Sequence, residues 1–176
     1  MKGSTTAFHG KGKYNKDPRF KLIKTIKLSC PDYYLHSKEL SRLYQQFFRA
    51  FDDDINDENF NKVSNKLKAG RDYKVKIFQN KQLVRSNDCL EFLKNQKVIL
   101  VGAQGLALLW QLKRNIFPAG KCTVSFDIKS SLFKDDDDSS RVPFITRDID
   151  DNYEFNLGYF QGDWLPDFCF ICFNCF

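Results

Sequence analysis

The hydrophobic and polar positions of the first half of the chain predict one strand followed by two helices. Segment 19–29, RFKLIKTIKLS, alternates apolar residues with lysines, which indicates a strand with one exposed face. From Ser37 to Phe51 the apolar residues recur at three- and four-residue spacing, which predicts a helix capped by the serine. A second helix is predicted from about Asp57 to Lys68, with Gly70 placed to end it. We expect the two helices to form an N-terminal hairpin.

The second half of the chain is predicted to be mainly strands, with two short helices. The expected elements are a strand at 73–78, a short helix at 88–94, a strand at 97–101, a helix at 106–113, a strand at 123–128 and further strands at 142–146, 153–160 and 168–176. The order strand, helix, strand over 97–128 resembles a central βαβ unit. The sequence therefore predicts a single α+β domain over residues 19–176, built on a mixed sheet.

Residues 1–18 have a different character, because they are rich in Gly, Ser, Thr, Lys and Asn and contain few large apolar groups. Such a segment cannot bury enough apolar surface to offset the entropy of ordering it. We therefore predict a flexible basic arm over residues 1–18.

The composition bounds the class of protein. With 176 residues, 42% hydrophobic content and 18 phenylalanines, the chain can bury a core packed largely from aromatic rings. No stretch approaches the roughly 20 apolar residues of a membrane-spanning helix, and the N-terminus lacks the apolar segment of a signal peptide. We therefore expect a cytoplasmic protein that does not enter a membrane and whose six cysteines are reduced.

Charge is distributed unevenly along the chain. Residues 1–30 carry eight basic groups and one acidic group, whereas residues 127–176 carry four basic and eleven acidic groups. Lysine and arginine near phosphates release condensed counterions, so the basic front of the chain indicates a polyanion or an acidic protein as partner. The residues predicted to make this contact are Lys11, Lys13, Lys16, Arg19, Lys21 and Lys24. The alternatives are a solubilising tail, or a fold that brings the two ends together and cancels their charges.

A glycine-containing turn is a candidate phosphate site. Gly102 and Gly105 fall between a predicted strand and a predicted helix, where backbone amides attract phosphate, and Asp127 follows at the distance of a ribose-binding acid. The run KVILVGAQGL with this later aspartate resembles the nucleotide-binding loop of ubiquitin-activating and ThiF-like enzymes over about 30 residues. The full glycine pattern is absent and too little chain follows for that fold, so we do not adopt the family. The simpler hypothesis is a tight turn between strand and helix.

The C-terminal cysteines are a candidate metal site. Cys169, Cys172 and Cys175 form two overlapping C-x-x-C spacings that could hold part of an iron–sulfur cluster or a zinc ion. An extended segment, however, would direct Cys172 to the opposite face from the other two. A buried strand is therefore favoured, and no metal ligands are assigned.

Two further patterns offer little for catalysis. Asp127 and Lys129 are similar to the second half of a PD-(D/E)xK nuclease site, but no first-half aspartate is found in the residues just before them. The two histidines, His9 and His36, have no visible partner for a catalytic triad. We therefore assign no catalytic residue and no cofactor.

The sequence favours a non-enzymatic accessory or adaptor subunit of a larger protein complex, with nucleic acid as a candidate partner of the basic arm. The apolar C-terminal strand would complete the sheet or dock into another subunit. A small nucleotide-binding enzyme using Gly102 to Gly105 and a metal-binding protein using the C-terminal cysteines are the two alternatives.

Overall fold

The computed structural model describes residues 17–43 and 45–175, so residues 1–16 of the predicted arm lie outside the described residues. Two α-helices, α1 (Ser86–Asn95) and α2 (Gly102–Lys113), lie in this part of the chain. Its strands are β1 (Phe20–Ser29), β2 (Ala50–Phe51), β3 (Asp72–Asn80), β4 (Val84–Arg85), β5 (Lys121–Ser125), β6 (Phe133–Lys134), β7 (Ser140–Arg147), β8 (Tyr153–Tyr159), β9 (Asp163–Trp164) and β10 (Cys169–Cys175). Short 3₁₀ turns occur at His36–Lys38, Gln45–Phe47, Arg114–Ile116 and Lys129–Ser131. The expected α+β fold is confirmed.

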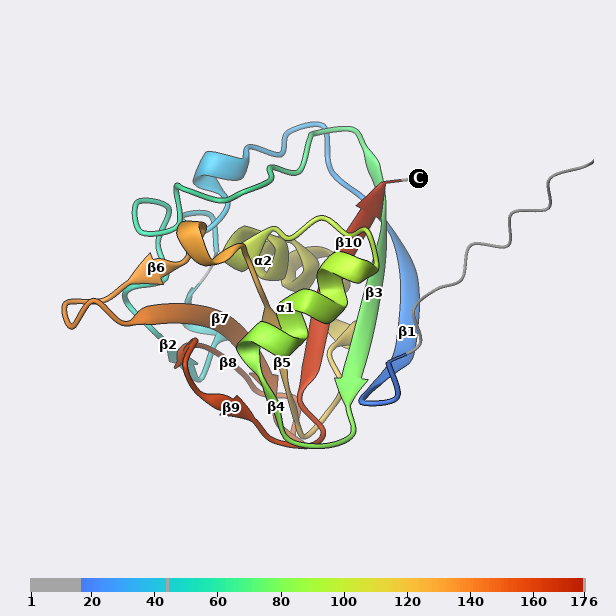
Figure 1. Cartoon of the computed structure of the whole chain (residues 1–176). Helices are drawn as coiled ribbons and strands as arrows, with labels where there is room; N and C mark the ends of the chain where they lie inside the picture. Colours follow the sequence, from blue (N-terminus) through green and yellow to red (C-terminus); the bar gives the residue numbers. More distant parts are fainter. Residues whose placement is uncertain (1–16, 44, 176) are drawn as a thin grey trace, which may run out of the picture.

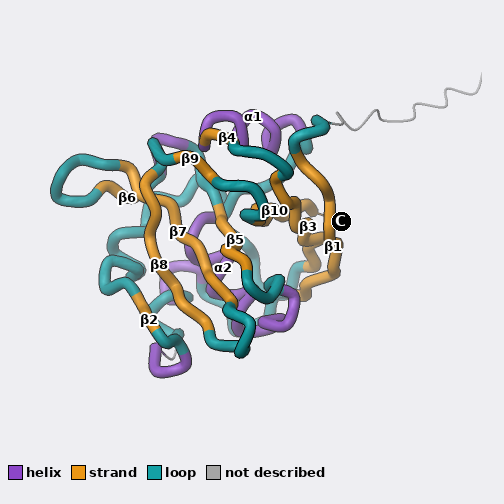
Figure 2. Tube along the Cα trace, turned by 90° about the horizontal axis from the view of Figure 1, so that it is seen from below, coloured by secondary structure: helices purple, strands orange, loops and turns teal. Residues whose placement is uncertain are grey.

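Eight of the strands form one mixed sheet in the order β1-β3-β10-β5-β7-β8-β2, with β6 added beside β7. Strand β10 is parallel to β5 and β2 is parallel to β8, whereas the other neighbours are antiparallel. Figure 2 follows this order from β8 on one side to β1 on the other. Strands β4 and β9 form a separate two-stranded sheet. The predicted mixed sheet is therefore present.

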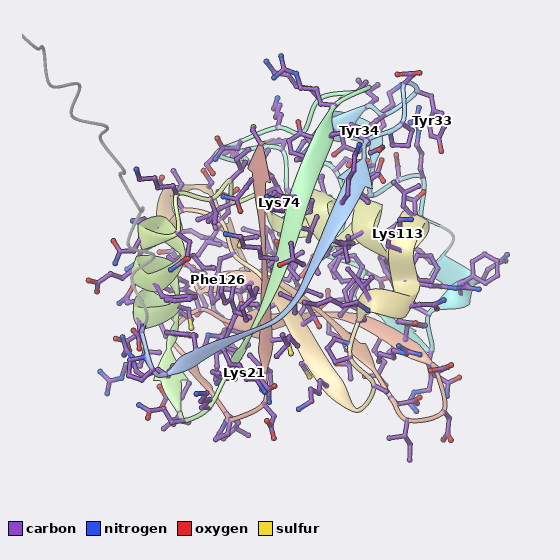
Figure 3. The ribbon with its side chains drawn as sticks, turned by 90° about the vertical axis from the view of Figure 1, so that its right-hand side faces the viewer. Lys21, Tyr33, Tyr34, Lys74, Lys113 and Phe126 are labelled. Atoms are coloured by element: carbon purple, nitrogen blue, oxygen red, sulfur yellow. The ribbon has the colours of Figure 1, made fainter. Side chains whose placement is uncertain are left out.

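The two helices cover opposite faces of the large sheet, which gives three layers (Figures 1 and 3). Successive side chains of a strand point to opposite faces, so β10 supplies both cores. Its Ile171 and Phe173 pack on the α2 face, while Phe170 and Cys172 pack on the α1 face. A strand that is apolar on both sides belongs in the middle of a sheet. The C-terminal strand accordingly completes this domain's own sheet between β3 and β5.

The predicted N-terminal helix hairpin is not formed. Residues 30–71 instead make a long connection of turns between β1 and β3 that contains two 3₁₀ turns and the two-residue strand β2. The apolar residues that suggested helices are nevertheless core residues, since Leu40, Leu43, Phe48, Phe60 and Leu67 are buried in the same cluster as α2. The three- and four-residue spacing therefore identified most of these buried positions, although Phe47 is 56% exposed, and it did not identify the backbone conformation.

Side chains that bind the backbone explain why turns replace these helices. Aspartate and asparagine compete for the backbone hydrogen bonds that a helix needs. The Asp57 carboxylate accepts hydrogen bonds from the amides of Leu40 (3.1 Å) and Ser41 (2.9 Å), and Asn56 Oδ1 accepts one from the Asn59 amide (2.9 Å). The Asp57 bonds tie the two halves of the connection to each other, and the Asn56 bond holds a local turn.

The predicted βαβ unit is also incomplete. The helix predicted at 106–113 is present as α2, which begins earlier at Gly102, and the strand predicted at 123–128 is present as β5. The segment 97–101, however, makes only an isolated antiparallel bridge between Ile99 and Phe173. Its apolar residues pack into the two cores instead, Val101 on the α2 face and Leu100 on the α1 face.

Candidate polyanion-binding surface

Strand β1 lies at one edge of the large sheet and presents three exposed lysines, Lys21, Lys24 and Lys27. A bulge between Leu22 and Lys24 shifts the alternation of the strand. Lys21 and Lys24 are therefore both on the α2 side, opposite Gln79 and Ile77, whereas Lys27 is on the α1 side. Figure 3 faces this edge. Lysines and a bulge protect an edge strand against pairing with another strand, so the side chains of β1 rather than its backbone are available to a partner.

A groove of about 710 Å³ lies on the α1 side of β1 and β3, beside α1. Its apolar wall consists of Phe20, Leu22, Phe78 and Phe92, and its polar wall consists of Thr25, Lys74, Lys76, Lys81 and Gln96, with Asp17 and Pro18 at one end. The rings of Phe20 and Phe92 are stacked with centroids 4.1 Å apart. The groove thus combines three cations and one carboxylate with an aromatic wall, and we call it the β1–β3 groove.

Arg19 joins the start of β1 to α1. Its guanidinium donates hydrogen bonds to the carboxylates of Asp17 (2.8 Å) and Asp88 (3.0 Å). The hydrogen bond from Arg19 lowers the pKa of the Asp17 carboxyl below its usual value. Of the predicted contact residues, Arg19 is therefore engaged by two acids, Lys21 and Lys24 are exposed on β1, and Lys11, Lys13 and Lys16 lie outside the described residues.

Two acidic turns of the second half of the chain lie at the other end of the strand order, whereas Asp167 lies beside β3, where it accepts a hydrogen bond from Gln79. The turns at 135–138 and 148–151 belong to β6, β7 and β8, which are separated from β1 by β3, β10 and β5. Their carboxylates pair with nearby arginines, Asp135 with Arg141, Asp148 with Arg49 at 3.1 Å, and Asp151 with Arg147 at 2.6 Å. Folding therefore places these two acidic turns and the lysines of β1 at opposite ends of the strand order.

Gly102 and Gly105, the candidate phosphate site, are both buried at the start of α2. A Cβ atom at Gly105 would lie 2.1 Å from Val101 Cγ2 and 3.1 Å from a ring carbon of Phe173. Gly102 has a φ of +55°, a conformation that favours glycine, and its amide donates to the Phe126 carbonyl (3.4 Å). Close packing and a turn account for both glycines, as the simpler hypothesis expected.

Asp127 lies next to this turn and is only 2% exposed. One carboxylate oxygen accepts a hydrogen bond from the Ser64 amide (3.0 Å), and the other accepts from the Ser64 hydroxyl and the Ile128 amide (2.7 Å). Burial raises the pKa of Asp127, and these hydrogen bonds partly oppose the rise. Lys129 instead lies over the Phe160 ring, 5.7 Å from its centroid. The carboxylate thus fastens the 30–71 connection to the end of β5.

We expect Asp127→Asn to lower the free energy of unfolding by about 2 kcal/mol, because an amide cannot accept all the hydrogen bonds that the buried carboxylate receives. Asp136→Asn, in an exposed acidic turn, is the matched control and should change stability by less than about 0.5 kcal/mol. Urea unfolding of both variants measures the difference. Equal stability of the two variants would show that Asp127 has no such structural role.

The C-terminal cysteines lie along β10 as a strand rather than in a loop. Cys169 and Cys172 are buried on opposite faces of the sheet, and burial raises the pKa of each thiol to about 12. Cys175 is exposed near the end of the strand. Within residues 17–43 and 45–175, no three His, Cys, Asp or Glu side chains are grouped as ligands of one metal ion.

The residues predicted to make contact did not include four that line the groove, Lys74, Lys76, Phe92 and Gln96. A signal existed for the two lysines, which alternate with Val75 and Ile77 and must therefore share one face of a strand. The sequence does not show that β1 lies beside β3 or that α1 closes one side of the groove. Both depend on the tertiary structure.

No helix in the described part of the chain is long and apolar enough to cross a membrane. In comparisons with known proteins, no family model, no curated protein and no solved structure matches this chain.

Proposed function

We propose that this protein is a non-enzymatic accessory or adaptor subunit that binds nucleic acid through the basic surface formed by β1, the β1–β3 groove and the lysines of the preceding arm. The separation of charge across the sheet carries the proposal. The β1 edge presents Lys21 and Lys24, and Lys27 on the same strand is paired with Asp72 of β3 at 2.5 Å, while the acidic turns pair with nearby arginines at the far end of the strand order.

The sequence of the arm adds to this positive surface. Residues 1–16 contain Lys2, Lys11, Lys13 and Lys16 and no acidic residue, and they join the chain directly before Asp17 at one end of the groove. A phosphate backbone that met several of these cations would release its counterions, which makes binding strongly dependent on salt.

The direct test is a double charge reversal on the β1 edge. Fluorescence anisotropy with a labelled oligonucleotide should show that Lys21→Glu/Lys24→Glu weakens binding at least about tenfold at 0.1 M salt and lowers the slope of log affinity against log salt by about 1 to 2. A matched control is Lys62→Glu/Lys113→Glu, which makes the same change of charge at two exposed lysines outside β1 and the groove. The control should lose much less affinity.

The arm is tested in the full chain by Lys11→Ser/Lys13→Ser/Lys16→Ser. We expect a further fall in the salt slope of about 2, because three cations that could each meet a phosphate are removed. If the β1 variant, the arm variant and the control all bind like the wild type, or if the wild type does not bind oligonucleotides in a salt-dependent manner, the proposed function is wrong.

A further inference from the structure

The β1–β3 groove has two chemically different ends, which follow from the register of its two strands. Leu22 pairs with Phe78 toward the start of β1, whereas Thr25 pairs with Lys76 and Lys27 pairs with Lys74 farther along. The bulge between these pairs keeps all of them on the α1 side. The apolar part therefore continues directly into a part that carries cations.

A ligand suited to this groove must be an anion with a flat apolar part. The volume of about 710 Å³ lies within the range of sites that bind organic ligands. Leu22 is 48% exposed and supplies most of the exposed apolar surface of the groove, whereas Phe20, Phe78 and Phe92 behind it are buried. Lys74 is exposed and Lys76 is 9% exposed; they lie two residues apart on one strand face, about 6.6 Å apart along β3, and both add positive charge to the groove.

The polar wall of the groove also contains side chains that can form hydrogen bonds with the edge of a planar heterocycle. The Thr25 hydroxyl and the Gln96 carboxamide both donate and accept hydrogen bonds, as nucleobase edges do. In a duplex the faces of the bases are stacked on their neighbours, whereas an unpaired base can be splayed out to lie against protein side chains.

We infer that the β1–β3 groove holds an unstacked base of a single-stranded nucleic acid whose phosphates contact Lys74, Lys76 and Lys27, the β1 lysine on the same side of the sheet. This inference rests on the proposed function and specifies its ligand as a single strand.

Filling the groove without changing its charge tests the inference. Leu22→Trp places an indole in the groove, and Leu83→Trp is the matched control because Leu83 is 52% exposed and lies outside it. Anisotropy is measured with one oligonucleotide as a single strand and as a duplex at equal salt. The wild type and Leu83→Trp should bind the single strand about tenfold more tightly than the duplex. Leu22→Trp should lose that preference while its duplex affinity and salt slope stay unchanged.

A second readout reports the base itself. A 2-aminopurine placed in the single strand should increase its emission several-fold when the wild type or Leu83→Trp binds, because the base leaves its neighbours, and should not do so with Leu22→Trp. Equal single-strand and duplex affinities, unaffected by Leu22→Trp, would overturn the inference and leave the proposed function standing. Absence of salt-dependent binding to either form would overturn both.

Discussion

Replacing Gly105 with alanine is expected to lower the free energy of unfolding by about 3 kcal/mol. Alanine is the better helix former by about 1 kcal/mol, which taken alone would stabilise α2. The added Cβ, however, would lie 2.1 Å from Val101 Cγ2 and 3.1 Å from a ring carbon of Phe173, and both residues are fully packed. Overpacking a rigid core costs more than the gain in propensity, because a branched side chain such as Val101 has little freedom to move away.

Two variants separate packing from other roles of this glycine. Gly105→Ala combined with Val101→Ala should recover part of the lost stability, since it removes the atom that the new methyl group meets. Gly102→Ala should cost only about 1 kcal/mol, because its neighbours lie 3.7 Å or more away and only its φ of +55° opposes a side chain. Chemical unfolding measures all three. A Gly105→Ala protein as stable as the wild type would contradict this account.

The second large effect concerns two buried ionisable groups within the 30–71 connection, Glu39 and His36. Glu39, 3% exposed, accepts a hydrogen bond from Gln111 Nε2 (2.7 Å), and burial raises its pKa to about 7 despite the opposing charge of Arg42. His36 hydrogen-bonds through Nδ1 to the Tyr34 hydroxyl (2.6 Å), and burial, helped by Lys66, lowers its pKa to about 4. Asp57 raises the pKa of both groups.

These two shifts act on stability in opposite directions. The raised pKa of Glu39 contributes stability that is complete below about pH 4.5 and is lost as the pH rises to about 7. The lowered pKa of His36 contributes stability that is complete above about pH 6.5 and is lost as the pH falls to about 4. Each contribution is about 3 kcal/mol, so they largely cancel in the wild type between pH 4.5 and 6.5.

Single substitutions should reveal a dependence of the free energy of unfolding on pH that the two groups cancel in the wild type. As the pH falls from 7 to 4.5, Glu39→Gln should lose about 3 kcal/mol relative to the wild type, because only the His36 contribution remains. Over the same range His36→Gln should gain a similar amount relative to the wild type. Urea unfolding at several pH values, with both differences set to zero at pH 7.5, measures the slopes. Parallel pH profiles for the three proteins would contradict the assigned shifts.

The elements with a clear local period were predictable. Alternation at Tyr73 to Phe78 predicted β3 and implied that Lys74 and Lys76 share a face, and the C-terminal run of phenylalanines and cysteines predicted a buried strand. In both cases the pattern within one segment dictates which residues face a core, because alternation is a property of the extended backbone itself.

The 30–71 connection was mispredicted for the opposite reason. The spacing of its apolar residues is compatible with a helix, but its backbone is held by side chains distant in sequence, such as Asp57 on Leu40 and Asp127 on Ser64. The Ser64 contact joins residues 63 positions apart, which no local window contains. Burial of most apolar residues was therefore predictable here, with Phe47 an exception at 56% exposure, and the backbone conformation was not predictable.

The candidate polyanion-binding surface was likewise predictable only in part. Its net positive charge and the exposure of Lys21 and Lys24 follow from the residues of one strand, whereas the groove requires β1 beside β3 and α1 over one face. The order of strands in a sheet is chosen by how distant segments share a core, and that choice put the acidic turns at the far side instead of against the lysines. Local periodicity is a short-range property of the backbone, while neighbours across a sheet depend on contacts whose partners lie far apart along the chain.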